Sequence, residues 1–410
     1  MVLLGSRHSA GTLRVQEFLT RNNHPYITID VDMDPAAQAV LDQFGVGVAD
    51  IPVLICRGQR VLKNPSNEAV AECLGYILAV DTSKARDVVV IGAGPAGLAA
   101  AVYGASEGLD VLVLESNAPG GQAGSSSHIE NYLGFPTGIS GQDLAARAYA
   151  QAERFGSDIA IARTATRLVC DRKLHRIELG PHDSVLARTV VIATGARYHR
   201  PELESLERFE GVGVYYSATA VEARLCGNED IIVVGGGNSA GQAAVFLSCS
   251  ARKVHVMVRG KSLSDTMSRY LIRRIEDTPK IRLLVETELV ALEGRDALER
   301  VTWLDKRTGE RATHEIGHVF MMTGASPNSA WLGDCVATDD KGFVKAGPDL
   351  TPQDLAATGW PLARQPYLFE TSRPGVFAVG DVRSASVKRI ASAVGEGSIC
   401  IQLVHKVLAE

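Results

Sequence analysis

Short apolar runs alternate with amphipathic segments over the first eighty residues, and this alternation predicts a small domain of strands and helices. Apolar side chains in residues 13–19 fall on one helical face, whereas residues 26–31 are rich in β-branched and aromatic side chains, as in a strand. The predicted order is a strand at 2–5, a helix from 9, a strand at 26–31, a helix at 35–44, strands at 51–56 and 58–62, and a helix at 67–78. Residues 81–85 are predicted to be a linker to the rest of the chain.

A glycine-rich turn follows the first strongly apolar strand after this linker, Asp87–Ile91. The turn, residues 92–97, has the pattern G-x-G-x-x-G and opens a small-residue helix, and the next strand ends at Glu115, about 20 residues further on. Glycines in this context let the backbone approach a pyrophosphate at the helix N-terminus, and the acid binds ribose hydroxyls. These residues predict a dinucleotide-binding unit.

A second turn of this kind, G-x-G-x-x-A at residues 235–240, follows the apolar strand Ile231–Val234. The next strand, Lys253–Val258, ends at Arg259 and not at an acid. An acid at this point binds the 2′-hydroxyl of NAD and repels the 2′-phosphate of NADP, so Arg259, with help from Lys261, favours NADPH over NADH. The alternative is that Arg259 is an ordinary solvated charge at the end of a strand.

A third apolar strand, Val376–Val379, ends in Gly380-Asp381 and leads into another small-residue helix. The carboxylate of Asp381 is expected to accept a hydrogen bond from a ribityl hydroxyl, while the helix N-terminus faces a carbonyl of a flavin ring. The first nucleotide-binding domain is thus predicted to consist of two separate stretches of sequence, with a second domain inserted between them. The predicted FAD-binding domain spans 86–210 and 324–410, and the predicted NADPH-binding domain spans 211–323.

Seven motifs between residue 86 and the C-terminus resemble thioredoxin reductase. In order they are GAGPAG (92–97), PGGQ (119–122), IENY (129–132), ATGA (193–196), GGGNSA (235–240), GASPN (324–328) and GVFAVGD (375–381). The resemblance implies an α/β fold with two Rossmann-like domains, the NADPH domain inserted in the FAD domain, and a homodimeric FAD-dependent NAD(P)H oxidoreductase. The FAD contacts that it implies are Gly92, Gly94, Pro95, Ala96, Gly97, Glu115, Gly121, Gln122, Asn131, Ala193, Thr194, Gly195, Gly380, Asp381, Lys388, Arg389 and Ile390. The NADPH contacts are Gly235, Gly237, Asn238, Ser239, Ala240, Arg259 and Lys261.

Residues 1–80 resemble the thioredoxin/glutaredoxin fold in the order of their predicted elements, and Ile51-Pro52 falls where that fold carries a cis-proline. In that family a C-x-x-C opens the first helix, because a helix N-terminus lowers the pKa of a thiol. Ser9 and Thr12 stand at about these positions, and Ser9 is interpreted as a helix N-cap. The first domain is therefore predicted to be a docking or regulatory module without redox chemistry of its own.

Thioredoxin reductases carry a second C-x-x-C over the flavin, and alignment places Ser217-Ala218-Thr219-Ala220 at those positions. Neither serine nor alanine forms a flavin adduct or a disulfide, so the usual route to a protein disulfide is missing. Cys226, the nearest thiol in sequence, is either a replacement nucleophile or a buried thiol.

Four residues are candidates to face the flavin: Tyr216, Ser217, Ala220 and His128. Tyr216 and its neighbour Tyr215 either cover the flavin or pack in the core. His128 either donates a proton to a substrate or is a hydrogen-bonded structural histidine.

Composition excludes several other classes of protein. The net charge of −5 gives no basic footprint for nucleic acid, and no apolar run approaches the ~18 residues of a membrane helix. The seven cysteines are widely spaced without any C-x-x-C, which argues against a disulfide framework or a metal site and for separate buried thiols in a reducing cytoplasm.

Three functions are compatible with these patterns. In the first, NADPH reduces a bound FAD that acts directly on a small molecule, a quinone or an electron carrier. The second is a disulfide reductase that uses distant or partner cysteines, and the third is a non-catalytic sensor or scaffold. The segment 351–366 is predicted to be a long loop that contacts a partner or is an inert insertion.

Overall fold

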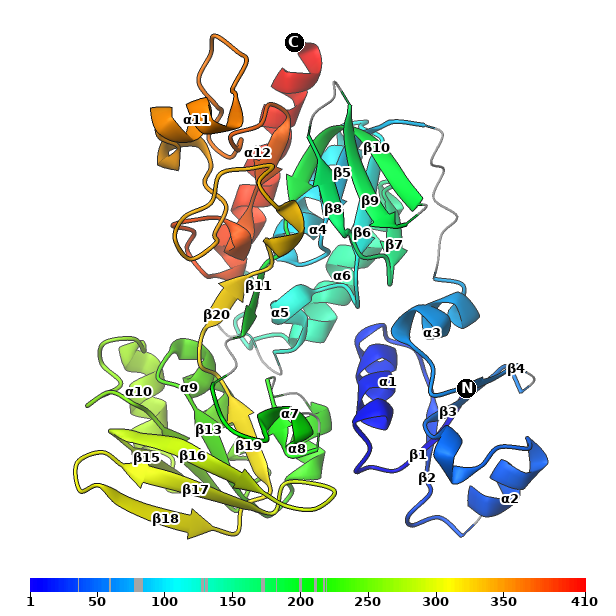
Figure 1. Cartoon of the computed structure of the whole chain (residues 1–410), viewed down its shortest axis with the longest axis vertical. Coiled ribbons are helices and arrows are strands. Elements are labelled where there is room, and N and C mark those ends of the chain that lie inside the picture. Colours follow the sequence, from blue (N-terminus) through cyan, green and yellow to red (C-terminus); the bar gives the residue numbers. More distant parts are fainter. Residues whose placement is uncertain are drawn as a thin grey trace.

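Three blocks, each with β-sheets of its own, make up the computed structural model (Figure 1). The structure describes residues 1–410 except 36, 59, 77–83, 127–128, 130–131, 171–173, 182, 199–200, 210–211, 217 and 219. We call the three parts the N-terminal block (residues 1–76), the central block (84–198 and 325–410) and the inserted block (201–323). The N-terminal and inserted blocks lie at the same end of the central block.

The N-terminal block is a four-stranded sheet with helices on both faces. Its elements are β1 (Val2–Gly5), α1 (Ala10–Arg21), β2 (Ile27–Asp30), α2 (Ala37–Gln43), η1 (Val48–Asp50), β3 (Val53–Cys56), β4 (Arg60–Lys63) and α3 (Asn67–Leu74). The sheet order is β2-β1-β3-β4, with β1 and β2 parallel and the other pairs antiparallel. Leu3 and Leu54 pack under α1 and α3, while their neighbours Leu4 and Val53 pack under α2, as the period of two in a strand requires.

The predicted order of elements in this block is confirmed. The Ile51–Pro52 peptide bond is cis, as its position predicted. Ser9 is the N-cap of α1, and its Oγ accepts a hydrogen bond from the backbone N–H of Thr12 at 3.4 Å.

The central block contains a seven-stranded sheet, and three of its α-helices pack on one face of that sheet. Its elements are β5 (Arg86–Ile91), α4 (Pro95–Ser106), β6 (Val111–Glu115), α5 (Gly121–Gly124), α6 (Gly141–Arg154), β7 (Asp158–Ile161), β8 (Arg167–Val169), β9 (His175–Gly180), β10 (Asp183–Ile192), η2 (Ala330–Leu332), η3 (Gly347–Asp349), α11 (Pro352–Thr358), β21 (Val376–Ala378), η4 (Gly380–Val382) and α12 (Ile390–Ala409). The order is β7-β6-β5-β10-β9-β8, and β21 also pairs with β10. Strands β7, β6, β5, β10 and β21 are parallel, whereas β8 and β9 form an antiparallel extension.

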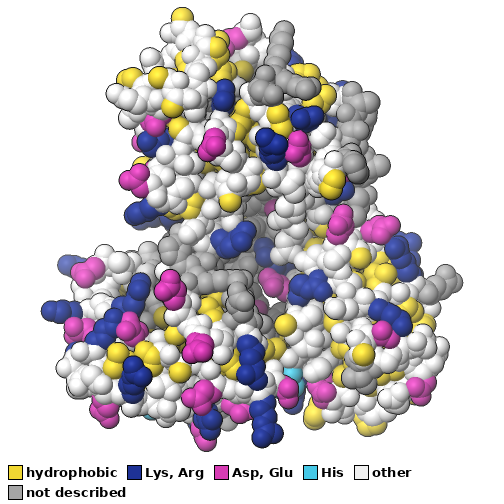
Figure 2. Space-filling model, in the orientation of Figure 1, with side chains coloured by type: hydrophobic (Ala, Val, Ile, Leu, Met, Phe, Trp, Pro, Cys, Tyr) yellow, Lys and Arg dark blue, Asp and Glu magenta, His cyan; other side chains and the backbone are white. Residues whose placement is uncertain are grey.

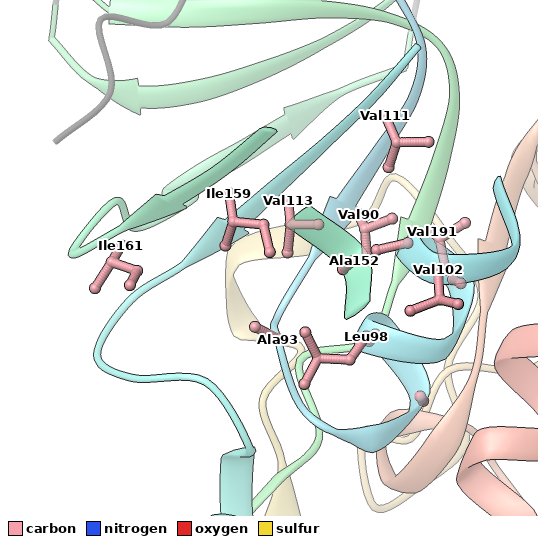
Figure 3. Close-up of a cluster of buried hydrophobic side chains, with 14 of the residues drawn as sticks. Val90, Ala93, Leu98, Val102, Val111, Val113, Ala152, Ile159, Ile161 and Val191 are labelled. Carbon is pink, nitrogen blue, oxygen red and sulfur yellow. The ribbon is translucent and has the colours of Figure 1, made fainter. Parts of the chain in front are cut away.

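Alternate residues of β5 enter two separate cores, because successive side chains of a strand point to opposite faces. Val88 and Val90 join the cluster on the α4 side, and Val89 and Ile91 join the cluster on the other face. Figure 3 shows the first of these, in which Val90 lies among apolar side chains from α4 and the neighbouring strands. This packing on both faces explains the uninterrupted apolar run that the sequence shows at β5.

The inserted block is connected to the central block by two crossings of the chain, β11 (Ala196–Tyr198) and β20 (Ala325–Pro327), which pair antiparallel. Its elements are α7 (Leu206–Phe209), β12 (Val214–Tyr215), α8 (Ala220–Leu225), β13 (Asp230–Val234), α9 (Asn238–Leu247), β14 (Lys253–Met257), α10 (Arg269–Glu276), β15 (Ile281–Leu284), β16 (Thr287–Glu293), β17 (Arg300–Asp305), β18 (Glu310–His314) and β19 (His318–Met321). Five strands form a parallel sheet in the order β12-β19-β13-β14-β15, and β16-β17-β18 form an antiparallel sheet.

The segment 351–366 is more ordered than the predicted long loop. It begins with α11, whose N-cap Thr351 and third residue Asp354 form a reciprocal capping box. After α11, Arg364 binds the buried carboxylate of Glu370 and the C-terminal residue Glu410. The segment therefore packs onto the end of α12.

The expectation that every cysteine is a separate thiol is wrong for four of the seven. Disulfides join Cys56 to Cys73 and Cys170 to Cys335, whose Cα atoms are 6.8 and 6.0 Å apart. The partners are 17 and 165 residues apart in sequence, so only the fold reveals the pairs. Cys226 and Cys400 are buried thiols as predicted, and Cys249 is an exposed one.

The described residues bear on two of the classes that composition excluded, membrane proteins and metal-binding proteins. None of their helices combines the length and apolar character needed to span a membrane, and no group of three or more potential metal ligands occurs among them. On the face in Figure 2, basic and acidic side chains are interspersed over all three blocks.

Candidate functional site

The first glycine turn joins β5 to α4 at the carboxyl edge of the seven-stranded sheet. Gly92 has a φ of +102°, and a Cβ at this position would lie 2.5 Å from the carbonyl oxygen of Ala193. A Cβ on Gly97 would lie 1.9 Å from the oxygen of Gly92, so the helix can start this close to the strand only with glycine there. The carboxylate of Glu115 accepts hydrogen bonds from the N–H groups of Ala93 (2.8 Å) and Asn117 (2.9 Å).

The PGGQ turn lies directly against this first turn. A Cβ on Gly121 would lie 3.1 Å from the Cα of Gly94, so the two backbones approach with no side chain between them. The N–H of Gly120 donates to the oxygen of Ala93 at 2.7 Å, which joins the turns. Gln122 extends toward the crossing strands and donates to the oxygen of Ala196 at 3.3 Å. The predicted residues Gly92–Gly97, Gly121 and Gln122 are thus brought together, and Ala193–Gly195 lie beside them.

The closing segment brings Asp381 to the same edge. A Cβ on Gly380 would lie 3.0 Å from the Cβ of Ala96, so η4 rests on the first turn. The carboxylate of Asp381 accepts no hydrogen bond from a described residue, and burial raises its pKa. Lys388 donates to the backbone oxygen of Asp381 at 2.6 Å, and burial lowers the pKa of its ammonium group. Arg389 is the N-cap of α12, which Ile390 begins.

Two residues that support this segment escaped the sequence analysis. The carboxylate of Glu396 on α12 accepts from the N–H of Gly380 at 2.7 Å and from both Nε (3.2 Å) and Nη2 (2.6 Å) of Arg383. Glu396 therefore fixes the Gly380-Asp381 turn from the following helix. In the sequence, Glu396 appears only as an acidic residue within a helix of small residues, and this pattern does not indicate which residues it contacts.

Asn328, the last residue of the GASPN motif, fastens the two crossings of the chain. Its Nδ2 donates to the oxygen of Thr194 at 2.9 Å, and its backbone oxygen accepts from the Thr194 hydroxyl at 2.7 Å. Arg197 of β11 donates through Nε to its Oδ1 at 3.2 Å. The motif is visible in the sequence, but its residues alone do not indicate this role of Asn328.

The second glycine turn joins β13 to α9 at the carboxyl edge of the five-stranded sheet. Gly235 has a φ of +143°, and a Cβ there would lie 2.1 Å from the oxygen of Met322. The loop after β14 closes over the turn, because Thr266 donates to the oxygen of Gly236 (2.7 Å) and Asn238 accepts from the N–H of Ser268 (2.8 Å). Gly237 is the N-cap of α9, and the predicted residues Asn238, Ser239 and Ala240 make up its first turn.

Arg259 and Lys261 follow β14 on the same edge of this sheet. Both side chains are exposed, and neither forms an ion pair with a described residue. Unpaired cations beside a glycine turn are the donors that a phosphate group requires.

The candidates for the flavin face are placed only in part. His128, Asn131 and Ser217 lie outside the described residues. Ala220 is the first residue of α8, and Tyr216 is partly buried against an apolar cluster of the inserted block.

Two neighbours of these candidates belong to the core. Tyr215 packs on Phe320 with ring centroids 5.3 Å apart. Cys226 is fully buried, and burial raises the pKa of its thiol to about 11.

The arrangement fits a flavin dinucleotide in the central block and a nicotinamide dinucleotide in the inserted block. In the first, a cradle of glycine backbone meets a partly buried carboxylate that lacks a hydrogen-bond donor among the described residues. In the second, a glycine turn at a helix N-terminus stands near unpaired cations. Both clusters lie at the carboxyl ends of parallel strands, where open α/β sheets bind ligands.

Comparisons with known proteins agree with this arrangement. A family model described as pyridine nucleotide-disulphide oxidoreductase matches residues 86–397. Thioredoxin reductase of Bacillus subtilis is 31% identical over 328 residues, which are 80% of this chain and 96% of that protein. The enzyme of Mycolicibacterium smegmatis is 32% identical over 325 residues, 79% of this chain and 97% of that protein.

Solved structures show the same likeness. Lactococcus lactis thioredoxin reductase in its FR conformation superposes with a TM-score of 0.70 at 29% identity and covers 79% of this chain and 99% of its own. The crystal structure of T. acidophilum thioredoxin reductase gives a TM-score of 0.69 at 27% identity with the same coverage of both chains.

Proposed function

We propose, from the premise that this chain belongs to the pyridine nucleotide-disulphide oxidoreductase family, that its flavin delivers electrons directly to an external acceptor. The chain is an FAD-dependent NAD(P)H oxidoreductase of the thioredoxin reductase type, and FAD and NADPH are its cofactors. The FAD supplies two-electron chemistry that accepts a hydride from NADPH. The net reaction converts NADPH, a proton and an oxidised acceptor into NADP⁺ and the two-electron-reduced acceptor.

The observation that carries the proposal is the complete lack of a C-x-x-C pair in the sequence. We take Ser217 and Ala220 to stand at the two cysteine positions of thioredoxin reductases, just after Tyr215-Tyr216 in the sequence. A side chain without sulfur can neither store electrons as a dithiol nor exchange disulfides. Electrons on the flavin therefore lack their usual carrier within this chain.

The remaining thiols support direct transfer over the disulfide-reductase alternative. Cys226 is fully buried, and its Sγ is 3.2 Å from the oxygen of Glu222, to which it donates. Burial raises its pKa to about 11, so the thiol stays protonated at neutral pH, whereas the thiolate is the nucleophile. Cys400 is also fully buried, and Cys249 lies after α9 on the surface of the inserted block.

The proposal assigns FAD to residues 86–210 and 324–410 and NADPH to residues 211–323. Glycine backbone of the first turn and of Gly121 would hold the pyrophosphate of FAD, Asp381 would accept from a ribityl hydroxyl, and Lys388 would help to hold the flavin end. The second glycine turn and Arg259 hold NADPH.

We further propose that residues 1–80 form a thioredoxin/glutaredoxin-like domain that recognises or regulates and does no redox chemistry of its own. The sheet order β2-β1-β3-β4, the parallel β1-β2 pair and the cis Ile51–Pro52 bond support the likeness. Ser9 caps α1, and Thr12 is fully buried under Gly5, so neither replaces a reactive cysteine.

The proposed acceptor is a small molecule, a quinone or a protein electron carrier, and the proposed assembly is a cytoplasmic homodimer. Dimers are usual among thioredoxin reductases, and this supports the assembly. The likeness to bacterial thioredoxin reductases supports the location.

Anaerobic reduction tests the proposal directly. FAD-loaded protein is mixed with NADPH or, separately, NADH, and the visible flavin absorbance is followed before and after addition of quinones, ferredoxins or oxygen. We expect rapid bleaching by NADPH and return of the absorbance with an acceptor, without any added thiol. A flavin that stays oxidised with both nucleotides, or that is reoxidised only by protein disulfides, contradicts the proposal.

Replacing Cys226 by serine is expected to leave turnover with the best acceptor within about twofold of wild type. The reason is that a buried, protonated thiol is not a nucleophile and takes no part in electron transfer through thiol–disulfide exchange. The measurement is steady-state NADPH oxidation, with Cys249→Ser as the matched exposed-thiol control. A tenfold or larger loss in Cys226→Ser alone, in a variant with unchanged flavin absorbance, would instead favour the disulfide-reductase alternative.

Replacing Arg259 by alanine is expected to raise KM for NADPH about 10- to 30-fold and to leave KM for NADH unchanged, because it removes a charged donor to the 2′-phosphate. Arg252→Ala is the matched control, since Arg252 is an exposed arginine at the opposite end of β14, paired with Asp230 at 2.8 Å. Equal effects on the two nucleotides would show that Arg259 is only a solvated surface charge.

A further inference from the structure

The N-terminal block docks onto the central block at the loops that border the proposed FAD site. Asn67 of α3 donates through Nδ2 to the side-chain oxygen of Asn117 at 2.9 Å. Gln142 of α6 donates to the oxygen of Thr20 and, at 2.7 Å, to Oδ1 of Asn23. Apolar side chains of α1 and α3 belong to the same buried cluster as those of β5 and α4. The contact is therefore built from both apolar packing and specific hydrogen bonds.

Arg21, the last residue of α1, extends furthest into this contact. Its Nη2 donates to the backbone oxygen of Gly121 at 2.9 Å, and the side chain is only 16% exposed. Glu17, one turn earlier, lies 3.6 Å from Nη1, and Nε is buried with no hydrogen-bond partner among the described residues. A Cβ on Gly124 would lie 3.8 Å from Nη2, so this atom lies near both ends of the 121–124 turn.

The same turn touches the proposed FAD cradle on its other side. Gly121 packs on Gly94 of the first glycine turn, as described above, and its φ of +52° belongs to the left-handed region. Glycine adopts this region without steric cost but is also free to leave it, so a charged donor on its carbonyl helps to fix the conformation of the turn.

Relatives without this block show that it is an addition to the family's fold. The Bacillus subtilis enzyme aligns over 96% of its own length with 80% of this chain, and the family model starts at residue 86. A segment of the size of the N-terminal block therefore has no counterpart in that enzyme. The Gly121 oxygen in this chain has a partner from outside the matched region.

We propose that the N-terminal block positions the FAD-binding turn from the side opposite Gly94, with Arg21 as the positioning residue. Arg21 does not touch the cofactor; it holds the Gly121 carbonyl so that the opposite side of the turn keeps its close approach to Gly94. The block thereby couples its own docking to flavin affinity. The inference rests on the proposed FAD site but not on the identity of the electron acceptor.

The test compares FAD binding by three variants of the full chain. FAD is removed from wild type, Arg21→Ala, Arg21→Lys and Arg60→Ala, and the fluorescence of added FAD is titrated with each apoprotein. Arg60 is the matched control, because it is an arginine of the same block that forms an exposed ion pair with Glu72 (3.2 Å), a residue of its own block. Hydrogen exchange of residues 119–124 is measured on the same samples.

We expect Arg21→Ala to weaken FAD binding about tenfold and to speed exchange in the turn, with Arg21→Lys intermediate and Arg60→Ala like wild type. Unchanged FAD affinity in an Arg21→Ala protein with native circular dichroism would overturn the inference. So would an equal loss in Arg60→Ala. The assay involves no reduction, so failure of NADPH to bleach the wild-type flavin affects the proposed function alone.

Discussion

Replacing Arg364 by alanine is expected to lower the free energy of unfolding by about 3–5 kcal/mol, because it leaves the charge of Glu370 buried without a cation. Glu370 has no exposed surface, and its carboxylate accepts two hydrogen bonds from Arg364, at 2.6 and 3.1 Å. Its remaining donors are the backbone N–H groups of Tyr367 and Gly375, both at 2.9 Å. Denaturant unfolding of the apoprotein measures the change.

The expected damage extends to the cofactor site, because Glu370 also holds the start of the strand that leads to Asp381. Gly375 immediately precedes β21, and Glu370 forms a β-bridge with Phe377 of that strand. The double variant Arg364→Ala/Glu370→Gln is the control. Removing the buried charge together with its partner should restore part of the lost stability. A cost below about 1 kcal/mol for Arg364→Ala alone would place this pair among ordinary surface ion pairs.

Local patterns were sufficient to predict the glycine turns and the strands that precede them. A strand packed on both faces needs an unbroken apolar run. A helix position whose Cβ would lie 1.9 Å from the oxygen of Gly92 needs glycine, so both features are encoded in consecutive residues. The N-cap at Ser9 and the cis bond at Pro52 are local in the same sense. These are the parts of the fold and site that sequence reasoning could reach.

Pairings between distant residues were out of reach. Glu396 and Arg383 support the Asp381 turn from neighbouring elements, and Cys170 meets Cys335 across 165 residues. An acid, an arginine or a cysteine has the same appearance in sequence whether or not a partner meets it. The prediction of a long loop at 351–366 was wrong for a related reason. The capping box of α11 is a local feature, but the ion pair between Arg364 and the end of α12 forms only in the completed fold.

The helix that closes the central block offers a test with an internal control. Replacing Gly397 of α12 by alanine is expected to cost about 2–3 kcal/mol of stability and to weaken FAD binding, because the new Cβ would lie 2.1 Å from the backbone oxygen of Ala96. Ala96 belongs to the first glycine turn, so α12 can move away from it only by opening the cradle of the cofactor.

Gly395, two residues earlier on the same helix, has no atom within 4 Å of the position that its Cβ would take. Gly395→Ala is therefore expected to stabilise the protein by roughly 0.5–1 kcal/mol, the usual gain for alanine over glycine inside a helix. Thermal and denaturant unfolding of both variants, with FAD titration, compares the two substitutions. If both stabilise the protein, the close approach of α12 to α4 is not tight, and the sign of the Gly397 effect follows helix propensity alone.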